Sequence, residues 1–319
     1  MEAWEATSIR YIKLGEQGRW AKKCFESNVL RFGFSSGTDK VRNLCLPFFN
    51  RTALIEHWIS GGRSAQTATN FTNQMQKYFE DIGETLWVTI DNGYLYYGFT
   101  DGKEIISDTN EEFFDGVDLS SHRRMDANGW RREDANGDLL KINVLSGRLT
   151  QIVGFQGTSC GFNNQVEEYL RARLRGSLNP SVLEVAHTLE NLQTEITQLI
   201  IDLHWKDFEL LIQLIFANSG WKQIFSVGGA KATIDLELQN PITGDVSFVQ
   251  VKSRASTAIL IDYIDKMNAS YYGRMFFVYH TGNVDATNID PNITVWDVKK
   301  VAEQVVKNGL IEWLMNKVK

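Results

Sequence analysis

Residues 233–253 read TIDLELQNPITGDVSFVQVKS, and this stretch decides how the C-terminal part of the chain folds. Apolar and polar residues alternate from 233 to 239, which is typical of a half-buried strand. Residues 240–245 are rich in turn formers, and 247–253 give a second, more apolar strand. The stretch therefore predicts a β-hairpin.

The two strands of this hairpin carry residues with catalytic chemistry. Strand side chains alternate between faces, so Asp235 and Glu237 share one face of the first strand and Gln250 and Lys252 share one face of the second. A carboxylate binds a hard divalent cation through oxygen, and Glu209, one helix earlier, can complete such a site. The lysine can orient water or balance charge on a phosphate. The spacing alone is weak evidence, because an alternating strand with Asp and Lys is usually a solvated face.

The flanking sequence extends this region in both directions. An amphipathic helix is predicted over 207–219 and is stopped by Gly220. A third, apolar strand is predicted over 274–280, and a closing helix over 299–318. His280 ends the third strand, and we expect a structural role for it.

The first part of the chain is expected to be mixed and strand-rich. Strands are predicted at 8–14, 29–34, 86–90 and 94–99, with helices at 18–27, 63–78, 164–175 and 181–202. The turn Asp91-Asn92-Gly93 joins two of these strands, which is a strong hairpin signal. Residues 105–160 are rich in Asp, Asn, Gly and Arg and predict loops with short strands.

Composition limits the class of protein. The chain has 319 residues, which predicts about two domains. The formal net charge of −6 argues against a polybasic-tail protein, although a local basic patch suffices for nucleic-acid binding. The three cysteines are far apart and form no CxxC pair. No signal peptide or membrane span is expected, so we predict a soluble, cytoplasmic protein without a membrane partner.

The C-terminal motifs occur in a characteristic order. They are Trp205-Lys206-Asp207-Phe208-Glu209, Gly228-Gly229, Ile234-Asp235-Leu236 and Val249-Gln250-Val251-Lys252. This combination resembles the Mrr-type restriction endonuclease domain, a branch of the PD-(D/E)xK nucleases. The motifs lie between residue 205 and about residue 280, and the resemblance extends over the C-terminal part of the chain.

The resemblance implies roles for four residues. Asp235 would be the metal-binding aspartate, and Gln250 would stand in the place of the second acidic residue, as is usual for the Mrr branch. Lys252 would be the catalytic lysine, and Glu209 the helix glutamate near the metal. The implied cofactor is Mg²⁺ or Mn²⁺, with Asp235, Glu209 and Gln250 as ligands. The glutamine carries no charge, but its carbonyl oxygen can ligate a cation or position water.

The N-terminal part has a resemblance of its own. Its motifs are Lys13-Leu14-Gly15-Glu16-Gln17-Gly18-Arg19-Trp20, Cys24-Phe25-Glu26 and Val29-Leu30-Arg31-Phe32-Gly33-Phe34. They look like the start of the PUA-like, EVE-related domains, over residues 1 to about 110. Such domains form a small β-barrel and often hold a flipped, modified base, which needs stacking faces and fixed hydrogen bonds. The candidate stacking residues are Trp20, Phe34, Trp87, Tyr94, Tyr96 and Tyr97.

These observations predict an α+β or α/β protein of three parts. The expected parts are a PUA-like β-barrel recognition domain at 1–120, an arginine-rich connector with linker helices at 121–202, and a nuclease-like mixed-sheet αβα domain at 203–319.

The expected function is a metal-dependent DNA endonuclease. The resemblance implies modification-dependent restriction of foreign DNA, as an antiviral defence, by a homodimer. Two alternatives stay open. One is an effector nuclease switched on by a signalling nucleotide, and the other is a non-catalytic nucleic-acid-binding protein on a nuclease fold.

Overall fold

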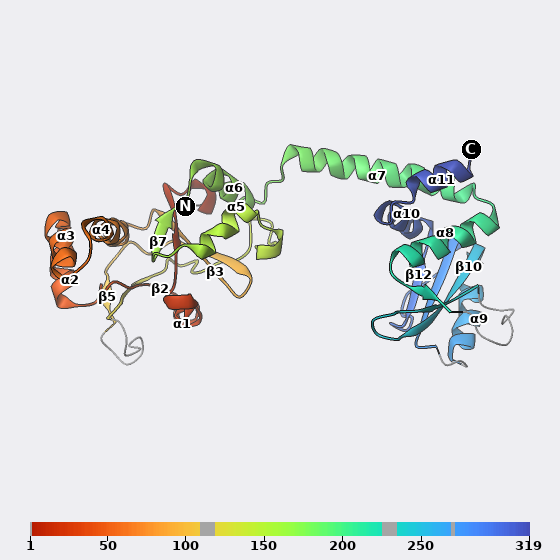
Figure 1. The fold of residues 1–319 in the computed structure, drawn as a ribbon, viewed down its shortest axis with the longest axis horizontal. Coiled ribbons are helices and arrows are strands. Elements are labelled where there is room, and N and C mark those ends of the chain that lie inside the picture. Colours follow the sequence, from red (N-terminus) through yellow and green to blue (C-terminus); the bar gives the residue numbers. More distant parts are fainter. Residues whose placement is uncertain (1, 109–118, 225–234, 269–271) are drawn as a thin grey trace. The chain divides into compact units, whose positions relative to one another are not determined.

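The computed structural model describes residues 2–108, 119–224, 235–268 and 272–319. The chain forms two compact units, which divide between Leu178 and Asn179 (Figure 1). The expected separate connector of 121–202 is therefore corrected. Its residues up to 178 pack into unit 1, and its long helix α7 (Pro180–Ile201) belongs to unit 2, because α7 buries Ile196 and Ile200 in the unit 2 core.

Unit 1 is built around a four-stranded mixed sheet with the order β4-β3-β1-β7. Its strands are β1 (Ser8–Ile12), β3 (Thr85–Asp91), β4 (Tyr94–Gly98) and β7 (Ser159–Gly161). β1 runs parallel to β3 and antiparallel to β7. The hairpin expected around Asn92-Gly93 is confirmed, and both turn residues have the positive φ that this turn requires.

A second sheet of unit 1 is antiparallel and has the order β2-β6-β5. It consists of β2 (Val29–Phe32), β6 (Ser121–Arg124) and β5 (Ile106–Ser107). An isolated β-bridge pairs Thr100, two residues after the end of β4, with Met125, directly after the end of β6. This bridge connects the segments that follow one strand of each sheet. Within the described ranges the sheets stay separate, so the closed barrel expected for this part is not formed. The short edge strands β5 and β7 leave too little ladder to close one.

Helices complete unit 1. They are η1 (Ala3–Glu5), η2 (Glu16–Gly18), α1 (Ala21–Glu26), α2 (Asp39–Cys45), α3 (Arg51–Ser60), α4 (Ala65–Phe79), η3 (Ile142–Val144), α5 (Gly147–Thr150), η4 (Gln151–Gly154) and α6 (Asn164–Leu174). One core cluster joins β2 to α1, α2 and α4, and another joins the four-stranded sheet to η1 and α6.

Unit 2 is a mixed five-stranded sheet with the order β12-β11-β10-β9-β8. The strands are β8 (Lys222–Gln223), β9 (Leu236–Gln239), β10 (Val246–Ser256), β11 (Arg274–Asn283) and β12 (Ile293–Trp296). β10 pairs antiparallel with β9, which confirms the predicted hairpin, and parallel with β11. The start of the first predicted strand, at 233–234, lies outside the described residues.

Helices cover both faces of this sheet. On one face, α7, α8 (Trp205–Asn218), α10 (Val298–Lys307) and α11 (Ile311–Lys317) pack against Val249 and Val251 of β10. On the other face, α9 (Thr257–Asn268) packs against Phe248. The prediction of a single closing helix over 299–318 is wrong. Two helices, α10 and α11, occupy this range, and Gly309 between them has a φ of +67°. None of the helices in the described ranges is long and apolar enough to span a membrane.

Candidate functional site

The candidate active site lies where β9 meets β10 in unit 2. Leu236 pairs with Val249, so Asp235, just before β9, lies beside the next residues of β10. The Oδ2 atom of Asp235 accepts the Val251 backbone N–H at 2.6 Å and also accepts the side-chain amide of Gln250. The structure thus brings together Asp235 and Gln250, two of the predicted site residues.

Gln250 is the most deeply buried residue of this site. Its exposed fraction is 1 %, and its Oε1 atom has no hydrogen-bond partner among the described residues. Most buried carbonyl oxygens are satisfied by a donor, so an unpartnered one requires an explanation. Its own amide donates to the Asp235 carboxylate, which leaves this oxygen available to a cation or a water.

Glu209 brings a second carboxylate from α8. Burial raises its pKa, and the negative charge of Asp235 raises it further, while Lys252 and Lys206 lower it. The charge of Asp235 therefore acts on Glu209 as a like charge. Such a pair disfavours the doubly ionised state unless a positive charge compensates it.

The pKa of Asp235 is also raised. Burial of the carboxylate is the largest cause, although the residue as a whole has an exposed position. The Val251 N–H, the charge of Lys252 and the Gln250 amide act in the opposite direction, because each favours the ionised form.

Lys252 lies two residues after Gln250 and is on the same face of β10, the face covered by α9. Its Nζ atom is 5.2 Å from the ring centroid of Tyr263 in α9. The charge of Lys252 acts on both Asp235 and Glu209. Asp235, Gln250 and Lys252 thus lie together at the β9–β10 pair, and the charge of Glu209 in α8 interacts with those of Asp235 and Lys252.

This residue set fits a hard divalent cation. Asp235, Glu209 and the unpartnered Gln250 carbonyl supply oxygen ligands, which Mg²⁺ prefers together with waters. No group of three or more His, Cys, Asp or Glu side chains suited to a metal occurs in the part of the chain that the structure describes. The metal would thus depend on the glutamine. Gly228, Gly229 and Ile234 of the predicted motifs lie outside the described residues.

His280, for which we expect a structural role, is buried. Its exposed fraction is 8 %, and neither ring nitrogen has a partner among the described residues. The His280 ring packs edge-on against the ring of Phe208, with centroids 4.6 Å apart. Phe208 directly precedes Glu209 in α8. Burial lowers the pKa of His280. The sequence indicates burial at this position because His280 lies two residues after the buried Val278, and alternate residues of a strand share one face.

Two of the six aromatic candidates of unit 1 line a common cavity, and four do not. Trp87 is fully buried, and its Nε1 donates to Asp81 at 2.9 Å, so it belongs to the core. Tyr97 is buried and donates its hydroxyl to the Glu133 carbonyl at 2.6 Å. The expectation of stacking faces at these two positions is therefore corrected.

Tyr94 and Tyr96 also lie away from the cavity. Tyr96 stacks on Phe25 with centroids 4.1 Å apart, and the Arg132 guanidinium lies 5.0 Å from the Tyr94 ring. Both tyrosines are on β4, and these two contacts occupy them.

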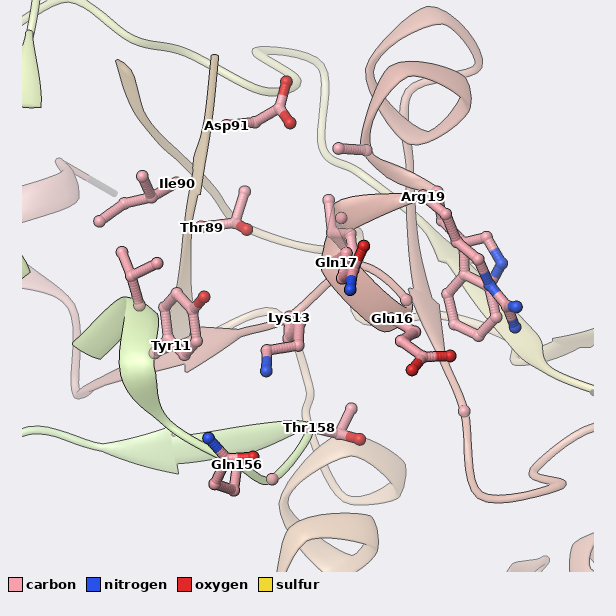
Figure 2. Close-up of a pocket in the computed structure, with 18 of the residues that line it drawn as sticks. Tyr11, Lys13, Glu16, Gln17, Arg19, Thr89, Ile90, Asp91, Gln156 and Thr158 are labelled. Atoms are coloured by element: carbon pink, nitrogen blue, oxygen red, sulfur yellow. The ribbon is translucent and has the colours of Figure 1, made fainter. Parts of the chain in front are cut away.

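The cavity of unit 1 has a volume of about 840 Å³ (Figure 2). Trp20 and Phe34, two of the six candidates, line it. Its remaining walls come from β1 and the loop after it, from the end of β3 at residues 89–92, and from Val153 and residues 156–158. Such a volume is in the range of sites for small organic ligands. The polar lining residues, such as Lys13 and Gln156, were not among the predicted pocket residues.

Comparison with known proteins adds no family to these observations. No family model, curated protein or solved structure matches the chain.

Proposed function

We propose that this protein is a metal-dependent DNA endonuclease whose active site is formed by Asp235, Glu209, Gln250 and Lys252. The observation that carries the proposal is the environment of Asp235 Oδ2. This oxygen accepts hydrogen bonds from the Val251 N–H and the Gln250 side-chain amide. The buried Gln250 Oε1 has no hydrogen-bond partner among the described residues. This arrangement suits oxygen ligation of a cation beside a lysine.

Each residue has a distinct part in the proposed reaction. Mg²⁺ or Mn²⁺ held by Asp235, Glu209 and Gln250 would polarise a phosphoryl oxygen and lower the pKa of bound water. Asp235 is fixed by the backbone of β10, so its carboxylate keeps one orientation. Lys252 supplies a positive charge where negative charge develops on the phosphate, an electrostatic contribution that is usually large in such reactions.

The proposed substrate is DNA, in keeping with the resemblance of the motifs to the Mrr-type nucleases. We place recognition of modified DNA in unit 1 and restriction of foreign DNA as the biological role. Cutting both strands requires two active sites, so the proposed active form is a homodimer.

A cleavage assay tests this function. Plasmid and phage DNA with plain, methylated, hydroxymethylated or glucosylated cytosine are incubated with the protein in Mg²⁺ or Mn²⁺. Lys252→Ala is compared with Lys266→Ala, a matched lysine whose Nζ lies 4.1 Å from the same Tyr263 ring. We expect Lys252→Ala to lose at least about 100-fold in rate, as for loss of one transition-state donor, and Lys266→Ala to retain activity.

The outcomes separate the parts of the proposal. Cutting of one modified substrate that Lys252→Ala abolishes supports both nuclease and modification dependence. Equal cutting of all substrates keeps the nuclease and rejects the modification dependence. Binding without cutting in any metal rejects the nuclease and favours a non-catalytic protein.

A further inference from the structure

The cavity of unit 1 offers little aromatic surface to a ligand. Trp20 has an exposed fraction of only 5 %, and the Arg31 guanidinium lies 4.2 Å from its ring centroid. Gly15 packs so closely that a Cβ there would be 2.8 Å from the indole. Phe34 lies against Phe71, with ring centroids 4.3 Å apart. Tyr11, the third aromatic residue of the lining, has an exposed fraction of 3 %. The aromatic residues therefore offer little area on which a flat ring could stack.

Polar side chains instead surround the open space. Figure 2 shows Lys13, Gln17, Gln156 and Thr158 around one common volume, with Thr89 facing it from β3. Amide side chains offer donors and acceptors together, and hydroxyl groups can act as either. A ligand that fills this space meets many hydrogen-bonding groups of both kinds.

The charged residues of the lining balance one another. Among the described lining residues, Lys13 and Arg19 are basic and Glu16 and Asp91 are acidic. A phosphate-rich ligand would meet two carboxylates as well as two cations, and like charges at close range are costly. The balance therefore favours a ligand that is polar and uncharged.

The wall opposite the Gly15 loop is held in place by hydrogen bonds. Gln74 Oε1 accepts the backbone N–H groups of Thr158 at 3.0 Å and Ser159 at 2.8 Å. The Lys13 backbone N–H donates to the Thr158 carbonyl at 2.7 Å, and its Nζ donates to the Phe155 carbonyl at 2.8 Å. A wall fixed before binding lowers the ordering cost that a ligand must offset.

We propose that this cavity binds a neutral, hydroxyl-rich ring of the monosaccharide class. The volume of about 840 Å³ accommodates a group much larger than a methyl substituent, and the mixed donors and acceptors match sugar hydroxyls. The ligand is either a hexose carried on a DNA base or a free hexose. The first form rests on the proposed DNA endonuclease function, whereas the site itself does not.

Binding measured in EDTA tests the site without cleavage. The full chain is titrated with duplex oligonucleotides that carry one glucosylated hydroxymethylcytosine, one hydroxymethylcytosine or one cytosine, and separately with methyl α-glucoside. We expect the glucosylated duplex to bind at least about tenfold more tightly than the other two, which corresponds to a few neutral hydrogen bonds.

Variants locate the binding in the cavity. Gln156→Ala and the nearly isosteric Thr89→Val each remove one polar group of the lining, and we expect each to reduce the preference about three- to tenfold. Gln151→Ala is the matched control, since Gln151 is exposed in the neighbouring η4 and does not line the cavity. It is expected to bind as the wild type does.

The possible results decide the proposal. Displacement of the glucosylated duplex by methyl α-glucoside supports a free hexose site, and retained preference without displacement supports a hexose joined to DNA. Equal binding of the three duplexes with no binding of the glucoside overturns the proposal. So does displacement by a cyclic dinucleotide, or a preference unchanged in Gln156→Ala and Thr89→Val. A protein that binds the sugar but cuts no DNA refutes the proposed endonuclease and leaves this site intact.

Discussion

The Oδ2 atom of Asp235 accepts the backbone N–H of Val251 at 2.6 Å, so this carboxylate is attached to the main chain of the neighbouring strand. Val251 lies between Gln250 and Lys252, the two site residues of β10. A carboxylate fixed by a backbone donor keeps its place when a neighbouring side chain is replaced. Substitutions of Gln250 and Glu209 therefore test charge and ligation at this site more than local collapse.

Gln250→Glu is expected to destabilise the metal-free protein and to increase the stabilisation that Mg²⁺ gives. A buried carboxylate beside Asp235 adds a like charge, which is costly until a cation compensates it. In EDTA we expect the midpoint of thermal unfolding to fall by about 5 °C or more, and Mg²⁺ to raise it by more than in the wild type. The control is Gln250→Leu, which removes the carbonyl. An identical Mg²⁺ response in all three proteins would exclude Gln250 as a ligand.

Glu209→Gln is expected to stabilise unit 2 while it removes metal-dependent activity. The pKa of Glu209 is raised by burial and by Asp235, so its ionised form costs folding free energy above the ordinary pKa of 4.5. We expect a rise of about 1–4 °C in the unfolding midpoint at pH 7 in EDTA. This gain should shrink as the pH falls and the wild-type carboxyl takes up its proton. Glu312→Gln, at an exposed position of α11, is the control, and an equal gain there would contradict the explanation.

His280→Phe is expected to reduce the acid sensitivity of unit 2. Burial lowers the pKa of His280 below its ordinary 6.5, so the unfolded chain binds the proton more readily. The neutral His280 side chain therefore makes its full contribution to the free energy of unfolding above pH 6.5. This contribution is lost as the pH falls from 6.5 through the pKa that His280 has in the folded state. Urea unfolding measured between pH 7.5 and pH 5 checks this. The free energy of unfolding should change less with pH in His280→Phe than in the wild type. The control is His187→Gln, at an exposed position, which should show the same pH dependence as the wild type.

Trp87→Ala is expected to destabilise unit 1 and not to probe the cavity. The side chain is fully buried, and large-to-small changes of buried aromatic residues cost about 3–5 kcal/mol. The change also removes the indole donor of Asp81, which is itself buried. Unfolding in urea, followed by near-ultraviolet circular dichroism, measures the loss. Trp205→Ala is the control because Trp205 is exposed, and a stable Trp87→Ala protein would refute the core assignment.

Much of unit 2 was predictable because its elements have clear periodicity. The alternation around Leu236 and Leu238 and the apolar run of β10 correspond to strands whose faces meet different helices. Three elements of unit 2, β8, α9 and β12, have no counterpart among the predicted elements. The helix α9 begins at Thr257 directly after β10 ends at Ser256, so no turn residue marks its start. The strands β8 and β12 have only two and four residues, which is too few alternations to decide a period.

The sites were predictable to different degrees. Asp235, Gln250 and Lys252 lie on adjacent strands, where a period of two fixes which side chains share a face. The cavity of unit 1 depends on segments far apart in the chain, such as Lys13 and Gln156, and no local pattern reports their contact. Aromatic residues are equally suited to a core and to a pocket, so sequence alone does not assign Trp87 and Tyr97 to the core in which they lie.

The pairing of β1 has a consequence for the order in which the chain is made. Arg10 of β1 pairs with Trp87 on one side and with Gly161 on the other. A ribosome delivers these partners long after β1 itself, whereas the five strands of unit 2 fall between Lys222 and Trp296. Until residue 161 emerges, one edge of β1 keeps its backbone N–H and C=O groups open to other chains. The second edge of β1 is thus enclosed only when β7 has been synthesised, and until then this edge is available for mispairing.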